Sequence, residues 1–271
     1  MAGLVPPRAG IKQKDRGLDP QTVIFWTLAG LAAFLVGLSK GGLPVIGMLA
    51  VPVMALAMDP LMAVGLLLPV YVASDMVGLY TYRHAYSVRN LKILIPATTL
   101  GIVIGWMIVG QVPKWAVTAI IGLIGAVFAL HLLTRGDPVG EPQPASLKKG
   151  LFWGTVAGYT SFIAHAGAPP YQVYALPQRM PKLVFAGTST ILFAWMNLIK
   201  LPPYIQLGQV NLSSLKDAAI LAVPAIIGVL VGVRVVKILP EKLFYQLATW
   251  ALLLVSLKLL WDALSPFVIS V

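Results

Sequence analysis

Apolar and polar residues alternate along this chain in long blocks, and the length of the blocks predicts membrane-crossing helices. Most apolar runs approach the ~20 residues that a helix needs to cross ~30 Å of hydrocarbon. The runs numbered two and seven are shorter, which predicts half-helices or one arm of a re-entrant hairpin. The ten runs are 22–40, 44–58, 60–81, 90–110, 114–134, 149–166, 169–178, 182–202, 214–236 and 241–262.

Composition agrees with an all-α integral membrane protein. Hydrophobic residues make up 58% of the 271 positions and charged residues 11%, against about 25% charged residues in soluble domains. There is no cysteine, so thiolate metal sites and cysteine nucleophiles are excluded. The net charge of +11 lies mostly in short connections between apolar runs, where the positive-inside rule places it. We therefore expect no nucleic-acid partner, no metal and no cofactor.

The two halves of the chain repeat each other. Gly42-Leu43-Pro44 matches Gly167-Ala168-Pro169 at an offset of 125 residues, and Asp75 falls on Asn197. This predicts a polar tail at 1–21, a first transmembrane repeat at 22–134, a cytoplasmic linker at 135–148 and a second repeat at 149–262. Because five segments per half is an odd number, the second repeat is expected to lie inverted.

The basic residues of equivalent connections support inversion. The connection after the third segment is rich in basic residues, whereas its counterpart in the second half, to which we assign Lys200 and Lys216, has fewer. The connection after the fourth segment has only Lys114, whereas its counterpart has more basic residues, namely Arg234, Lys237 and Lys242. Inversion puts both termini outside. An eight-span model with parallel repeats and an internal N-terminus fits the total charge equally well, so it stays open.

Each short segment follows a residue that can carry positive charge. Lys40 precedes Gly41-Gly42-Leu43-Pro44, and His165 precedes Ala166-Gly167-Ala168-Pro169. A glycine permits a turn, and a proline suits the first turn of a new helix. The N-terminus of such a helix attracts anions. We therefore expect an anion site between the two breaks. The alternatives are that Lys40 lies at the membrane interface and that His165 only packs.

Further polar residues near these breaks are candidates for the same site. Tyr171 and Gln172 follow the second break, while Thr188 and Asn197 lie in the eighth segment. Asp75 is the most deeply apolar acid of the chain, and an ionisable residue at that depth marks function by default. It is a candidate for coupling to a proton or cation, or else it pairs with a basic residue of another segment.

The motifs GLSKGGLP, GYTSFIAHAGAPP, YALPQ and FAGTST resemble the TauE/SafE family of membrane permeases, over about residues 25 to 260. The resemblance implies a carrier of sulfite, organosulfonates or related sulfur-containing anions. The resemblance carries over as site positions only those within the family's motifs, with Asp75 as the coupling candidate among them, namely Lys40, Gly42, Pro44, Asp75, His165, Gly167, Pro169, Thr188 and Asn197.

We therefore expect a secondary transporter that exports a sulfonate such as sulfoacetate, or sulfite, across the cytoplasmic membrane of a bacterium. No ATP-binding P-loop motif is present, and we expect no enzymatic activity. The partners are a small anion and membrane lipid, with a homodimer left open. The alternatives are a cation- or proton-coupled carrier of another small substrate and, less favoured, an intramembrane enzyme.

Overall fold

A computed structural model describes residues 20–58, 60–108, 111, 113–134, 142–208, 210 and 212–268. Most of the predicted tail and residues 135–141 of the predicted linker lie outside these ranges. All regular structure in the described residues is helical, as the sequence predicts.

Each predicted apolar segment coincides with a helix or a helix pair. The first half contains α1 (Pro20–Lys40), the 3₁₀ helix η1 (Pro44–Leu49), α2 (Ala50–Met54), α3 (Pro60–Tyr82), α4 (Val88–Met107) and α5 (Lys114–Thr134). The second half contains α6 (Leu147–Ala164), α7 (Ala168–Ala175), the 3₁₀ helix η2 (Leu176–Gln178), α8 (Lys182–Gln206), α9 (Leu212–Ile238) and α10 (Glu241–Val268).

Within the described ranges, seven helices are long and apolar enough to cross a membrane: α1, α3, α4, α5, α8, α9 and α10. The second predicted segment, 44–58, ends earlier than expected. It begins as η1 at Pro44 and continues as α2, which ends at Met54. Stretches of 3₁₀ helix longer than three or four residues are uncommon and mark strain or a hinge. The six residues of η1 therefore set this interruption apart from ordinary helix packing.

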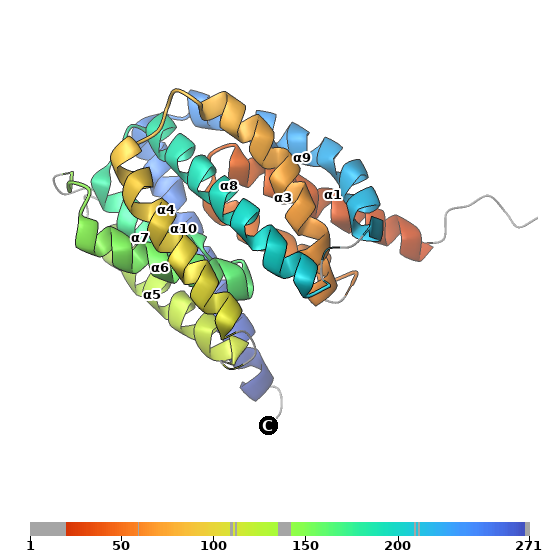
Figure 1. Cartoon of the computed structure of the whole chain (residues 1–271). Helices are drawn as coiled ribbons and strands as arrows, with labels where there is room; N and C mark the ends of the chain where they lie inside the picture. Colours follow the sequence, from red (N-terminus) through yellow and green to blue (C-terminus); the bar gives the residue numbers. More distant parts are fainter. Residues whose placement is uncertain are drawn as a thin grey trace, which may run out of the picture.

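The helices form two groups that meet along α8 (Figure 1). Helices α1, α3 and α9 pack together on one side, while α4, α5, α6, α7 and α10 form the other. Helix α8 packs against both α3 and α4 and so lies between the groups. The most extensive helix contacts are those of α1 with α9, α4 with α6 and α5 with α10.

Glycines allow two of these pairs to approach closely. A Cβ on Gly228 of α9 would lie 2.3 Å from the carbonyl oxygen of Phe34 in α1. A Cβ on Gly101 of α4 would lie 2.0 Å from the carbonyl oxygen of Thr155 in α6. Small residues let helix backbones touch in membranes, where van der Waals packing drives association. The G-x-x-x-G spacings that begin at Gly101 and Gly228 are therefore packing motifs.

Candidate functional site

The first interruption is a glycine turn at the end of α1. Helix α1 ends at Lys40, and Gly42 has a φ angle of 114°, which residues other than glycine rarely adopt. A Cβ at Gly42 would also lie 2.7 Å from the Cβ of Ala186. The chain then enters η1 through Pro44. The predicted glycine turn is confirmed at this break.

The second interruption turns at a different residue from the one predicted. His165 has φ of 52° and caps the C-terminus of α6 in the left-handed conformation, whereas Gly167 has a right-handed φ of −76°. The prediction that Gly167 provides the turn is wrong. Gly167 is required for space instead, because its Cβ would lie 2.9 Å from both the carbonyl oxygen of Ala157 and the Cβ of Ser161.

Prolines remove backbone donors from the starts of both interrupted segments. Pro44 opens η1, and of the first three residues of α7 only Ala168 keeps an N–H, because Pro169 and Pro170 follow it. In addition, η1 is a short 3₁₀ helix and carries a smaller dipole than a full α-helix. Side chains are therefore needed as hydrogen-bond donors in this region, above all beside α7.

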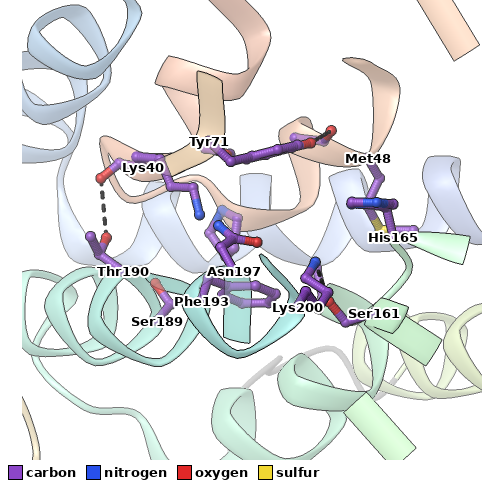
Figure 2. A pocket seen from close by; sticks show the side chains of 14 residues that line it. Lys40, Met48, Tyr71, Ser161, His165, Ser189, Thr190, Phe193, Asn197 and Lys200 are labelled. Atoms are coloured by element: carbon purple, nitrogen blue, oxygen red, sulfur yellow. Dashed lines mark hydrogen bonds between the residues drawn. The ribbon is translucent and has the colours of Figure 1, made fainter. Parts of the chain in front are cut away.

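The two interruptions and α8 enclose a small polar cavity (Figure 2). Its volume is about 30 Å³, enough for roughly one or two water molecules. Side chains from both halves of the chain converge on it. The lining residues are Ser39, Lys40, Pro44, Gly47, Met48, Tyr71, Ser161, His165, Ala168, Ser189, Thr190, Phe193, Asn197 and Lys200.

Lys40 and Asp75 form a buried ion pair beside this cavity. The Nζ atom of Lys40 lies 2.8 Å from Oδ1 of Asp75, and the two side chains are 3% and 1% exposed. Asn197 donates from Nδ2 to Oδ2 of Asp75 at 2.8 Å. Of the two alternatives for Asp75, pairing with a basic residue of another segment is the one observed. The interfacial alternative for Lys40 is wrong, because its side chain is enclosed.

Aromatic rings and a hydroxyl hold Lys40 in position. Its Nζ lies 5.1 Å from the ring centroid of Tyr71 and 5.7 Å from that of Phe193, within the range of cation–π attraction. The hydroxyl of Thr190 donates to the main-chain oxygen of Lys40 at 3.1 Å (Figure 2). The ion pair is therefore fixed by groups from α3 and α8.

Lys200 is the site residue that the sequence analysis missed. It was assigned to the connection after the eighth segment, but it lies inside α8 and is 1% exposed. Its Nζ donates to Oγ of Ser161 at 3.1 Å (Figure 2). Because Lys200 does not lie in a connection, it does not count in the charge comparison that favoured inverted repeats. The sequence signal was its position one turn after Asn197, on the same helix face.

His165 is held between two tyrosines. Its ring stacks on Tyr71, with centroids 6.0 Å apart, and its Nε2 lies 3.1 Å from the hydroxyl oxygen of Tyr204. That hydroxyl also lies 2.9 Å from the carbonyl oxygen of Phe162. A hydroxyl has one proton and a carbonyl can only accept, so Nε2 donates to Tyr204. Neutral His165 then has no second N–H for an anion.

The comparison with protein families decides what kind of protein carries this cavity. The family model described as "Sulfite exporter TauE/SafE" matches residues 28–259. The chain belongs to the TauE/SafE family. It is therefore a membrane protein of a family of transporters of sulfur-containing anions. A comparison with curated proteins found no match, and a comparison with solved structures found none.

Several predicted site residues of this TauE/SafE protein lie outside the cavity lining. Gly41 packs against Gly232, and its carbonyl accepts the hydroxyl of Tyr82 at 2.5 Å. The hydroxyl of Thr188 donates to a carbonyl of its own helix, while its neighbours Ser189 and Thr190 line the cavity. The remaining residues outside the lining are Gly42, Gly167, Pro169, Tyr171 and Gln172.

Gly42 and Gln172 line a separate, apolar cavity of about 220 Å³ between η1, α9 and α10. Of the predicted substrate-site residues, Lys40, Pro44, His165 and Asn197 line the polar cavity. The structure thus brings Lys40, His165 and Asn197 together, and adds Lys200 and Ser161 to them.

Proposed function

We propose that this protein is a secondary transporter that moves a sulfur-containing anion, sulfite or a sulfonate such as sulfoacetate, outward across the bacterial cytoplasmic membrane. The observation that carries the proposal is the polar cavity between two interrupted segments, with buried lysines, in a chain of the TauE/SafE family. Interrupted helices near the bilayer midplane are the usual binding elements of secondary transporters.

The helix pairing supports alternating access between two related halves. If α6 corresponds to α1 and α9 to α4, the pairs α1–α9 and α4–α6 are the same contact made twice. The helices α3 and α8, also equivalent, contact each other, as do α5 and α10. A two-fold axis that relates the two halves produces both observations, the contact made twice and the contacts between equivalent helices. With an odd number of segments in each half, we infer an inverted repeat around the cavity.

Such a transporter would open the cavity to one side at a time. At about 30 Å³ the cavity is too small to admit a sulfonate without separation of its walls. Those walls belong to both helix groups, since Tyr71 lies on α3 and Ser161 on α6. Relative movement of the two groups along α8 would therefore both enlarge the cavity and open it.

The membrane potential favours outward movement of an anion. An inside-negative potential contributes about 2.3 kcal/mol per elementary charge per 100 mV. Export therefore requires no coupling ion. Asp75 remains the candidate for proton coupling, because a proton on its carboxyl group would release Lys40 from the ion pair.

Transport in proteoliposomes tests the proposal. Purified protein is reconstituted into liposomes loaded with sulfite, sulfoacetate, taurine or chloride, and efflux is followed with and without an inside-negative potassium diffusion potential. We expect efflux of sulfite or sulfoacetate, faster with the potential, and no comparable efflux of chloride. Liposomes without protein are the control. Absence of efflux for every sulfur compound would overturn the proposal.

The same assay addresses the second candidate, a cation- or proton-coupled carrier of another small substrate. Asp75 is the observation that favours it, because it is the one buried acid in the described part of the chain. Its engagement with Lys40 opposes direct cation binding. Efflux that requires a proton or sodium gradient would favour this candidate over an uncoupled exporter.

A further inference from the structure

The charged groups around the polar cavity do not balance. Lys40 and Asp75 neutralise each other at 2.8 Å. Lys200 is buried as well, yet among the described residues no carboxylate oxygen lies within the 4.0 Å of an ion pair from its Nζ. With all three groups ionised, the cavity therefore carries one unbalanced positive charge.

A buried ammonium group without a counter-charge is costly, because it has lost its hydration without gaining a partner of opposite sign. Lys200 has three N–H donors, of which one is directed to Ser161. Two donors remain for a ligand. Since Ser161 accepts this hydrogen bond, its own hydroxyl proton is free for a ligand too. Lys200 and Ser161 thus offer a charge and up to three hydrogen bonds at one place.

Lys40 and Asn197 are directed to Asp75, and the remaining polar side chains of the lining donate to other groups of the protein. Ser189 donates to the carbonyl of Ala186, and Thr190 donates to that of Lys40. Neutral His165 donates from Nε2 to Tyr204. This leaves Lys200 and Ser161 as the groups of the described lining that are best placed to bind an oxyanion.

We propose that the cavity binds one negative charge, held by Lys200 and Ser161, and that the transported species is a monovalent anion with a compact oxyanion group. A singly charged sulfonate or hydrogensulfite satisfies this requirement. A sulfonate with an additional carboxylate does not, because Asp75 already occupies the second lysine. The inference rests on the proposed function and narrows its substrates to one charge state, so that sulfoacetate, a dianion, becomes a poorer substrate than a sulfonate with a single charge.

Isethionate and sulfoacetate form a matched pair of probes. Both have two carbons and one sulfonate, but isethionate ends in a hydroxyl and sulfoacetate in a carboxylate. We expect wild-type protein in proteoliposomes to show a KM at least about 10-fold lower for isethionate, because an uncompensated second charge is strongly disfavoured in a buried site. A lower KM for sulfoacetate would overturn the inference.

Substitutions of Lys200 and of Asp75 should change the KM values of the two probes in different ways. Lys200→Met should raise the KM for isethionate on the order of 30-fold or more, and Lys200→Arg should retain part of the affinity. Asp75→Asn should leave Lys40 without its counter-charge and so shift the ratio of the two KM values toward sulfoacetate, by about 10-fold or more. Lys216→Met, at an exposed position, is the control and should match wild type.

The outcomes separate the inference from the proposed function. If wild-type protein transports neither probe nor sulfite, both fail. If it transports them but Lys200→Met is unchanged, or Asp75→Asn keeps the wild-type preference, only the charge inference fails. The melting temperature of each variant in detergent identifies misfolding. If Lys200→Met misfolds, the wild-type preference and the Asp75→Asn shift still decide the inference.

Discussion

Because Lys40 and Asp75 form a buried ion pair, we expect substitutions of the two residues to have strongly non-additive effects on the free energy of unfolding. At 2.8 Å and an effective dielectric constant of about 20, the Coulomb attraction is about 6 kcal/mol. Much of this offsets the cost of removing both charges from water. The pair as a whole therefore contributes little to the free energy of unfolding. When one residue of the pair is replaced, however, the charge of the other remains in a site that is at most 3% exposed.

We expect each single substitution, Lys40→Met or Asp75→Asn, to lower the free energy of unfolding by about 3–5 kcal/mol. The double variant removes both charges and should lie within about 1 kcal/mol of wild type. The loss in Asp75→Asn should be the smaller of the two. An asparagine keeps a hydrogen-bonding group beside Asn197, whereas Lys40→Met leaves a buried carboxylate.

The assay is a double-mutant cycle in detergent micelles, with unfolding followed by the fluorescence of the seven tryptophans. The pair Lys258–Asp262 on α10 is the control, since its side chains are 35% and 43% exposed. Its coupling energy should be about 0.5 kcal/mol or less. Additive effects at Lys40 and Asp75, or equal coupling in the two pairs, would refute the reasoning.

Two further predictions concern the first interruption and the topology. Gly42→Ala should lower the free energy of unfolding by about 1–3 kcal/mol, because of its φ of 114° and the contact with Ala186. The control Gly30→Ala, with no atom within 4 Å of the added Cβ, should be neutral or stabilising. Thermal melting measures both variants, and equal losses would contradict the prediction. Pro144→Cys should react with an impermeant maleimide only from the cytoplasmic side and Pro113→Cys only from the periplasmic side, in a chain without native cysteine; labelling of both from one side would rule out the inverted topology.

The sequence alone was sufficient to locate the helices, because in a membrane each crossing must be long, apolar and internally hydrogen-bonded. The ten predicted segments coincide with the observed helices to within six residues at each end, the largest differences being the early end of the second at Met54 and the late end of the tenth at Val268. The interruptions were also visible, since Gly42 and the prolines that follow each break are local determinants of backbone conformation.

The tertiary structure alone decided which polar groups meet. Lys200 stands near the end of an apolar run, before two prolines, and its sequence position does not distinguish an interfacial lysine from a buried one. Only the packing of α8 between α3 and α4 places it in the cavity. Likewise, the partner of Asp75 comes from α1, 35 residues earlier in the chain, and no periodic pattern records that contact.

The turn at His165 shows the same division. The residues around the break predict that the backbone must turn, and glycine is the usual residue for a left-handed conformation. In the structure Gly167 is needed where Ala157 and Ser161 approach it, and the left-handed conformation falls on His165. The sequence by itself determined where helices begin and end, because those are properties of neighbouring residues in a known solvent. The charges that face one another depend on distances between helices far apart in the chain, and these only the tertiary structure decided.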